Sequence, residues 1–410
     1  MRPGSALSFL TIVLLAGCAA TNGSPGVATS TVASPGAYGG GVVSKSRDPG
    51  GSLDPTPGSL DVRTYRGGDT RAGVMPGPGP DGQPLIRWTF EAGAPIGSQV
   101  AVVGGVVYVV STDGVVHALD LDTGTERWKS SIGAETFASP SVVDGLVIIG
   151  ASDGSHAFAV TDGSPAWFTP ETGDVHGCPA IAGHTAVFAS HSGTATALDT
   201  KTGAVLWSRP MRAADDSSVA AADGVAVLGL QNGVVVALAI ADGTERWRSD
   251  TGDGARVGTL AVADDRVFVP TLDGGSAGSR HITALDLATG HLLWRFASPG
   301  DKPAYAPAIA DGRAIVDGED GSVTALEPAT GAVLWQSKAP GRVEIVAAIA
   351  DGVSYGASNG GVAFAIDATT GAERWQIPIQ GIPYGAAVTS GLVLIGTSTG
   401  VLYAIGGTLP

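Results

Sequence analysis

The sequence predicts an all-β protein, an eight-bladed β-propeller, and three observations carry that prediction. Eight tryptophans recur at nearly even spacing, a glycine precedes seven of them by four residues, and short apolar runs fill the intervals. The 62 glycines and 25 prolines exclude helix bundles and coiled coils, while a hydrophobic content of 44% favours a sizeable core over wholesale disorder. A period of about 40 residues built from short strands is typical of a propeller blade.

The repeat is marked by its tryptophans and by the turn before them. The tryptophans are Trp88, Trp128, Trp167, Trp207, Trp247, Trp294, Trp335 and Trp375. The glycines four residues before the last seven are Gly124, Gly163, Gly203, Gly243, Gly290, Gly331 and Gly371. Five of these turns read Asp/Glu-x-x-Thr-Gly, in which the acid can accept backbone N–H bonds and the glycine adopts a left-handed conformation. Because they repeat at one structural place, we expect the tryptophans to pack one blade against the next.

Each period also predicts three strands before the one that carries the tryptophan. In the second unit these strands are residues 141–143, 146–150 and 157–160, and Asp-Gly turns separate them. Val, Ile, Ala and Leu dominate the runs with imperfect alternation, as in strands packed on both faces. A blade is therefore four antiparallel strands.

The ends of the chain predict how the ring closes. Three strands follow the last tryptophan, at 386–388, 393–397 and 401–405, and no tryptophan strand comes after them. The segment 85–90 has no preceding triplet, so we expect it to complete the last blade as its fourth strand. The one long interval is explained by residues 272–280, which lengthen the turn between the second and third strands of the fifth unit.

The N-terminus predicts an exported lipoprotein. Residues 1–18 contain an apolar stretch at 6–16 followed by Leu15-Ala16-Gly17-Cys18, which matches a bacterial lipobox. We expect lipidation of Cys18 and anchoring of the protein outside the cytoplasm, to the cell membrane or an outer membrane; an ordinary signal peptide is the alternative. Residues 19–82 are rich in Gly, Pro, Ser and Thr and predict a flexible linker, whose later part we expect along the surface of the folded domain at 83–410.

Charge and cysteine content exclude several classes of function. The net charge of −15 repels nucleic-acid backbones and anionic lipid surfaces. The two cysteines, Cys18 and Cys178, rule out a disulfide framework and a four-thiolate zinc site. We expect Cys178 to be a small buried residue near an innermost strand, and His117 to be a packing residue, because other units hold unrelated residues at its place.

The repeat from Val102 to Trp128 resembles the pyrroloquinoline-quinone-like propeller repeat, and with the lipobox the whole chain resembles the BamB-type lipoproteins. The resemblance implies a monomeric, non-enzymatic scaffold or recognition module that binds an envelope protein or complex and needs no cofactor or metal. One alternative is a quinoprotein alcohol or sugar dehydrogenase, with pyrroloquinoline quinone and Ca²⁺ in the central channel. The family enzymes stack their cofactor on a disulfide between adjacent cysteines, and here no two cysteines adjoin. An extracytoplasmic small-ligand sensor is a further alternative.

One set of loop positions varies while the turns around it repeat. These positions lie where the chain returns from each outer strand toward the centre, beginning at Gly97. We predict that they form a ring at one mouth of the channel that binds a partner or ligand: Phe137, His176, Asp216, Arg256, Tyr305, Glu344 and Tyr384. Unconstrained drift of exposed loops is the alternative explanation. Strand addition at the outer blade edges is a second predicted docking route.

Overall fold

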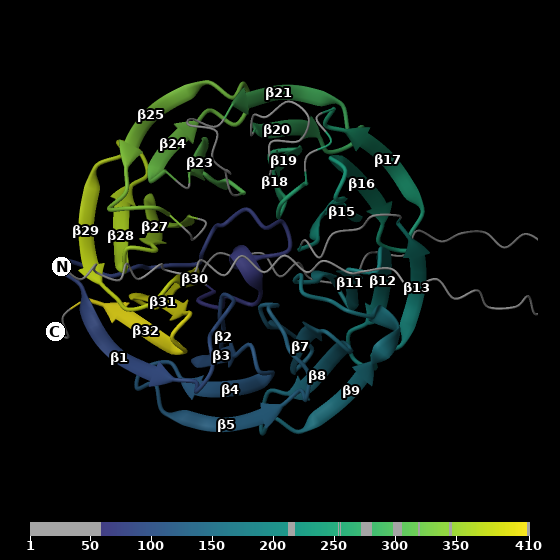
Figure 1. The fold of residues 1–410 in the computed structure, drawn as a ribbon, viewed down its shortest axis with the longest axis horizontal. Helices are drawn as coiled ribbons and strands as arrows, with labels where there is room; N and C mark the ends of the chain where they lie inside the picture. Colours follow the sequence, from purple (N-terminus) through teal and green to yellow (C-terminus); the bar gives the residue numbers. More distant parts are fainter. Residues whose placement is uncertain are drawn as a thin grey trace, which may run out of the picture. The chain divides into compact units, whose positions relative to one another are not determined.

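A computed structural model describes residues 59–211, 218–252, 254, 256–271, 281–297, 306–318, 320–343 and 347–407. These residues form eight four-stranded antiparallel sheets arranged around a central axis, which confirms the predicted propeller (Figure 1). Apart from strands, the described residues contain two single-turn 3₁₀ helices, η1 (Tyr65–Gly67) and η2 (Pro170–Thr172). None of their helices has the length and apolarity needed to cross a membrane.

The two inner positions of each blade are occupied by short, buried strands. The innermost strands of blades 1 to 8 are β2 (Ala101–Val103), β6 (Ser141–Val143), β10 (Ala180–Ala182), β14 (Ala220–Ala222), β18 (Ala261–Ala263), β22 (Ala308–Ala310), β26 (Ala348–Ala350) and β30 (Pro383–Thr389). The second strands are β3 (Val106–Val110), β7 (Leu146–Ala151), β11 (Thr185–Ala189), β15 (Val225–Gly229), β19 (Arg266–Pro270), β23 (Arg313–Asp317), β27 (Val353–Ser358) and β31 (Leu392–Thr397). Small residues dominate the innermost strands because the blades converge there.

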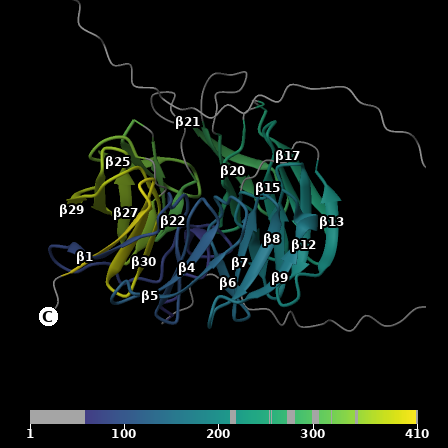
Figure 2. The ribbon, with the colours of Figure 1, turned by 60° about the horizontal axis from the view of Figure 1, so that its bottom comes forward.

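The two outer positions differ in exposure. The third strands are buried along most of their length: β4 (Val115–Asp120), β8 (Gly154–Ala159), β12 (Thr194–Asp199), β16 (Val234–Ala239), β20 (His281–Asp286), β24 (Ser322–Leu326), β28 (Val362–Asp367) and β32 (Val401–Gly406). The outermost strands are largely exposed: β5 (Glu126–Ser131), β9 (Pro165–Thr169), β13 (Val205–Pro210), β17 (Glu245–Asp250), β21 (Leu292–Ala297), β25 (Val333–Lys338), β29 (Glu373–Pro378) and β1 (Leu85–Glu91). Figure 2 shows the same sheets from the side.

The ring closes as predicted. Strand β1 pairs antiparallel with β32, from Leu85 opposite Gly406 to Glu91 opposite Val401. The N-terminal strand is thereby the fourth strand of blade 8. This pairing covers an edge of β32 that would otherwise present unpaired backbone groups. Residues 272–280 fall between β19 and β20, the second and third strands of blade 5, as predicted, and they lie outside the described residues.

The tryptophans join neighbouring blades, as the repeat predicted. Trp88 donates its indole N–H to the carbonyl of Leu121 in the next blade at 3.0 Å. The same bond recurs from the indoles of Trp128, Trp167, Trp207, Trp247, Trp294 and Trp335. Each of these seven indoles also lies against the turn glycine of the next blade, so that a Cβ on Gly124 would be 2.6 Å from the Trp88 ring. Packing and backbone conformation, with φ of +70° at Gly124, both require glycine here.

The turn acids act as predicted. Asp120 Oδ1 accepts hydrogen bonds from the amides of Asp122 and Thr123 and from the Thr123 hydroxyl. Hydrogen bonds from the Arg127 guanidinium and from Thr123 lower the pKa of Asp120 to about 2. The register shift between Ala118 and Leu119 marks the bulge that follows the turn. The acid therefore stabilises the turn rather than serving chemistry.

The centre of the ring is filled by the chain's own N-terminal segment, which we call the plug (residues 59–82; purple in Figure 1). It passes the innermost strands in blade order, and in blades 1 to 7 the amide at the middle of that strand donates to a plug oxygen at 2.7–2.8 Å. These donors are Val102, Val142, Ile181, Ala221, Val262, Ile309 and Ile349; their acceptors, in the same order, are Val62 O, Arg63 O, Asp69 Oδ1, Asp69 O, Thr70 O, Ala72 O and Gly73 O. In blade 8 the amide of Ser390 donates to Gly77 O at 3.3 Å.

The prediction of a flexible linker over 19–82 is wrong for residues 59–82, and so is the expectation that this part lies along the surface. The composition argument considered whether the segment could bury enough of its own apolar surface to fold. The plug instead hydrogen-bonds to inner strand edges of all eight blades, through its backbone in seven of them and through the Asp69 side chain in blade 3. Gly67 permits the tight path, since it has φ of +87° and a Cβ there would lie 1.8 Å from Val74 O. Residues 1–58, including the predicted signal segment and Cys18, lie outside the described residues.

Candidate recognition face and central plug

The loops that lead from an outermost strand to the next innermost strand all lie on one face of the ring, because successive strands alternate in direction. We call this face the recognition face; it also holds the turns between second and third strands. Phe137 and His176 come from consecutive loops and their rings lie 5.4 Å apart between centroids. Phe137 is 51% exposed although it is a large apolar side chain. The structure thus brings two predicted site residues together as an exposed aromatic pair.

His176 is held by a neighbouring carboxylate. Its Nε2 lies 2.8 Å from Asp174 Oδ1, and its side chain is 23% exposed. Gly97 occupies the corresponding loop one blade earlier, where a Cβ would lie 3.2 Å from the Phe137 ring. The Phe137 side chain therefore covers the space next to Gly97, and the variation at these positions has a packing component.

The other predicted ring residues are placed separately. Tyr384 lies on β30 and lines a cavity between the innermost strands and the plug, and Arg256 is exposed just before β18. Asp216, Tyr305 and Glu344 lie outside the described residues. The binding ring as a whole therefore stays a prediction, with the Phe137–His176 contact as its observed part.

Two buried arginines are what the sequence analysis missed at this centre. Arg71 is 0% exposed, and its guanidinium donates to Val219 O (3.0 Å), Tyr65 O (2.8 Å) and Gly68 O (3.1 Å), among others. Arg66 is 3% exposed, and burial lowers its pKa to about 10. Both residues adopt left-handed backbone conformations, with φ of 57° and 56° for Arg66 and Arg71. The signal available in the sequence was the presence of arginines in a segment of otherwise mostly small residues.

The remaining candidate residues are packing residues. His117 is 4% exposed, lies 2.7 Å from Glu126 Oε1 through its Nδ1, and contacts Phe90 edge to face. Cys178 is buried and unpaired, and its sulfur accepts the amide N–H of Ser139 at 3.1 Å. Neither environment provides a base next to a nucleophile, as covalent catalysis requires.

The channel does not fit a planar quinone. Where a quinoprotein would place cofactor and cation, this ring holds the plug, which hydrogen-bonds to the inner strand of every blade. Among the described residues, no group of three or more His, Cys, Asp or Glu side chains is placed to hold a metal ion. Among the described residues, the carboxyl group of Asp317 acts electrostatically on buried Arg66, and burial raises the pKa of Asp317 to about 7.

Fold and site together define a class: a propeller of quinone-enzyme-like repeats whose channel is filled by its own chain. Residues 80–228 and 231–408 match the family described as outer membrane protein assembly factor BamB, and the chain belongs to that family. A relative named outer membrane protein assembly factor BamB, from Burkholderia pseudomallei, is 29% identical over 268 residues. The match covers 60% of this chain and 66% of the relative, which is just under two thirds of its length.

Solved structures share the fold. The crystal structure of BamB from Moraxella catarrhalis superimposes with a TM-score of 0.66 at 18% identity, covering 79% of this chain and 98% of that one. A quinohemoprotein alcohol dehydrogenase from Comamonas testosteroni gives a TM-score of 0.69 at 14% identity, covering 86% of this chain and 81% of that one. At these identities the likeness concerns architecture only, and it does not favour one function over another.

Proposed function

We propose that the protein is a non-enzymatic scaffold or recognition module of the cell envelope, which binds a protein partner or complex through loops of the recognition face. Membership in the assembly-factor family supports this function over a dehydrogenase. The observation that carries it is the plug, because it runs through the centre of the ring and leaves the faces and the outer edges as the surfaces large enough for a protein partner. A ring fixed by closure and by the plug presents these surfaces preorganised, so little ordering entropy is lost on binding.

The exposed aromatic pair is the proposed centre of the docking surface. Aromatic side chains supply large contact area at low entropic cost and are enriched at the energetic centres of interfaces. Phe137 is exposed in the described chain, and His176 beside it supplies a polar edge held by Asp174. Outer strands offer a second route, since strand β21 exposes Leu292 and Leu293 (54% and 45%) beside a free strand edge.

Site-specific photo-crosslinking in the native envelope tests the docking proposal. A photoreactive phenylalanine analogue replaces Phe137 on the recognition face, Leu292 on the outer edge, or Thr123 on the opposite face as the matched control. Mass spectrometry of the adducts should identify a partner at position 137 and none at position 123. Capture of the same partner at position 292 would show that the outer edge also takes part. A partner captured equally from all three positions, or only from position 123, contradicts docking on the recognition face.

We further propose that the chain binds neither pyrroloquinoline quinone nor Ca²⁺. The purified protein is mixed with both, and bound-cofactor absorbance and dye reduction by alcohols or sugars are recorded. Neither signal is expected, because the plug occupies the space that the ring of the cofactor needs. Appearance of both signals would establish the quinoprotein alternative.

Anchoring through Cys18 outside the cytoplasm and a monomeric state complete the proposal. Metabolic labelling with an alkyne fatty acid should mark the wild-type protein, and Cys18→Ala should lose the label and leave the membrane fraction. The Cys178→Ala variant is the control, since that thiol is buried, and its labelling should equal that of wild type. Label retained in Cys18→Ala contradicts lipidation at this position.

A further inference from the structure

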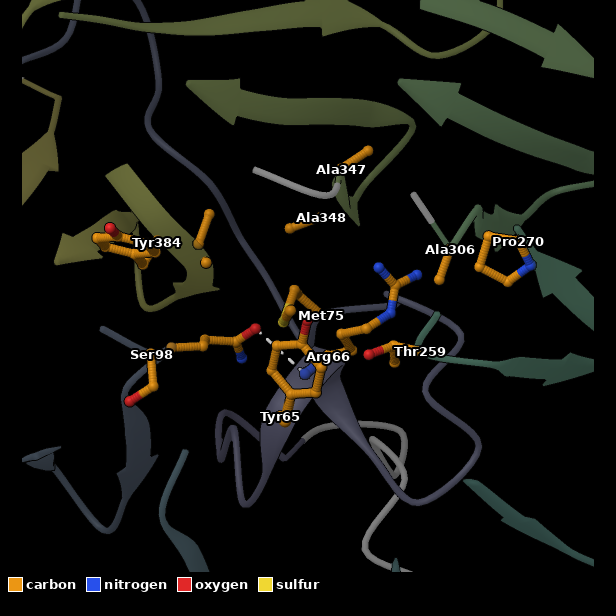
Figure 3. Close-up of a pocket in the computed structure, with 13 residues that line it drawn as sticks. Tyr65, Arg66, Met75, Ser98, Thr259, Pro270, Ala306, Ala347, Ala348 and Tyr384 are labelled. Carbon is orange, nitrogen blue, oxygen red and sulfur yellow. Dashed lines mark hydrogen bonds between the residues drawn. The ribbon is translucent and has the colours of Figure 1, made fainter. Parts of the chain in front are cut away.

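A cavity of about 270 Å³ lies between the plug and the innermost strands (Figure 3). The plug contributes Tyr65, Arg66 and Met75, the loop before β2 contributes Gln99, and β30 contributes Tyr384. Ala348 of β26 is part of the opposite wall. Thr259, Pro270 and Ala306 complete the lining, so the cavity draws on the plug and on five blades and is not one more surface groove between two blades.

Two residues that line this cavity each carry a buried donor without a hydrogen-bond partner within the described chain. The donors are Nη1 of Arg66 and Nε2 of Gln99, on residues that are 3% and 2% exposed. The other polar atoms of both side chains are occupied. Arg66 donates from Nε to Arg71 O at 2.7 Å and from Nη2 to Pro307 O at 2.6 Å.

The orientation of the Gln99 amide is fixed by the plug. Its Oε1 accepts the backbone N–H of Arg66 at 3.1 Å, a bond drawn as the dashed line in Figure 3. The amide nitrogen is therefore the atom left over, and it can only donate. A buried donor without an acceptor costs about 1–3 kcal/mol, more when it is charged, so a ligand with oxygen acceptors gains by filling the space.

The positive charge of the buried arginines favours an anionic acceptor in the cavity. Arg66 and Arg71 place two guanidinium groups inside the ring, and within the described chain Arg71 donates to neutral oxygen atoms of the plug and the inner loops. Asp317 acts electrostatically on Arg66, and because burial raises its pKa to about 7 it is only partly ionised at neutral pH. The buried carboxylate of the plug, Asp69, accepts the amide N–H of Ile181 through Oδ1. An anionic group near Arg66 is favoured in such a low-dielectric place.

The walls between the polar atoms are apolar. Met75 is 4% exposed, Ala348 is 1% exposed, and the Tyr384 ring forms part of the rim at 36% exposure. A short carbon skeleton fits this lining, and the volume is below the range of drug-sized ligands.

We propose that this cavity is a binding site for a small organic carboxylate that carries a second oxygen acceptor. The carboxylate accepts from Arg66 and the second oxygen accepts from Gln99, with the carbon skeleton against Met75 and Ala348. A free small molecule and the C-terminal residue of a polypeptide share this chemistry. The site goes beyond scaffold function, because partner docking does not require it.

Calorimetric titration with N-acetyl-L-alanine tests the proposal, since this probe has one carboxylate and one amide carbonyl. Wild type should bind it saturably, and the neutral N-acetyl-L-alaninamide should bind at least about tenfold more weakly. An acetylated tetra-alanine with a free C-terminus runs in parallel. Equal binding of the peptide assigns the site to chain termini as well, whereas binding of the short probe alone assigns it to free molecules.

The Gln99→Glu variant is the sharpest test of the site. It keeps an oxygen to accept the Arg66 amide and replaces the free donor by a carboxylate oxygen, so affinity should fall at least about tenfold. Gln336→Glu makes the same chemical change on the exposed outer strand β25 and should leave affinity within about twofold of wild type. Circular dichroism confirms that both variants fold.

Three results overturn the proposal. One is the absence of saturable binding of either carboxylate to the folded wild-type protein. The second is equal binding of the neutral amide, and the third is unchanged affinity in folded Gln99→Glu. As a check on location, the side-chain amide NMR signal of Gln99 should shift on addition of the carboxylate, which a purely structural role of Gln99 would not produce.

Discussion

The glycine beside each indole combines two requirements at one residue. Gly371 has φ of +74°, and a Cβ there would lie 2.6 Å from the Trp335 ring; Gly145 has the same φ but open space around it. Comparing substitutions at Gly371 and Gly145 therefore separates the cost of the backbone conformation from the cost of packing against the indole. The conformational cost alone is about 1–2 kcal/mol, and forced overpacking adds about 1–3 kcal/mol.

We therefore predict that Gly371→Ala lowers the free energy of unfolding by about 2–5 kcal/mol and Gly145→Ala by about 1–2 kcal/mol. Urea unfolding followed by tryptophan fluorescence measures both. Equal losses in the two variants would show that the indole contact contributes nothing and that conformation alone selects glycine.

Asp317 provides a pH-dependent prediction at the same scale. Burial raises its folded-state pKa from 3.8 to about 7, so the folded protein keeps a proton that the unfolded chain releases above about pH 4. Stability from this group is full below the unfolded pKa and falls as pH rises toward the folded pKa, by on the order of 4 kcal/mol in total. The Asp317→Asn variant cannot ionise and should lose that part of the pH dependence.

Thermal unfolding between about pH 5 and pH 8 measures the difference. The melting temperature of wild type should fall more steeply across this range than that of Asp317→Asn. Parallel curves for the two proteins would mean that Asp317 is ionised in the folded state throughout.

At the scale of elements, the plug occupies the centre of the ring, the place where other propellers hold a ligand. Arg71 anchors it through bonds to oxygens of the plug and of two neighbouring inner loops, and no water needs to enter to satisfy its guanidinium. Removing the Arg71 side chain leaves several buried carbonyl oxygens without a hydrogen-bond donor. Such a loss belongs to the small group of severely destabilising substitutions.

We predict that Arg71→Ala lowers the free energy of unfolding by at least about 3 kcal/mol. Arg209→Ala is the matched control, because Arg209 also donates to a carbonyl, Asp242 O at 3.0 Å, but at an exposed place. Its effect should stay within about 0.5 kcal/mol in the same denaturation experiment. A loss of similar size in both variants would contradict an anchoring role for Arg71.

Elements with a strong local signal could be predicted from the sequence, and the plug could not. Each blade carries its own turn acid, turn glycine and indole, so strands such as β31 and β32 were predicted within about one residue. The plug has no periodicity, and its stabilisation depends on strand edges about 40 to 320 residues away in sequence. The cavity was missed for the same reason, since Tyr65, Arg66 and Met75 in its lining belong to the plug.

At the scale of the whole molecule, two devices close the structure on itself. Strand β1 completes blade 8, and the plug bonds to every innermost strand, so each blade depends on both neighbours and on the centre. The apolar clusters also link neighbouring blades, since each contains buried residues from adjacent blades. A ring of this kind should unfold as one unit, whereas an open repeat array can lose terminal repeats first.

Differential scanning calorimetry checks this cooperativity. We expect a single transition with equal calorimetric and van't Hoff enthalpies. Separate transitions, or a calorimetric enthalpy well above the van't Hoff value, would indicate that blades unfold independently of the plug and of the β1 closure.

Amide hydrogen exchange of the full-length protein tests the central claim most directly, namely that the N-terminal segment is an integral part of the ring. The plug amides that donate to innermost strands, Val62 to Val102 O, Met75 to Ile349 O and Gly77 to Val388 O, should exchange as slowly as the strand amides that donate to the plug, and peptides within 60–78 should show this protection. Complete exchange of 60–78 at the earliest time point, with the blades still protected, would show a free leash and an open channel.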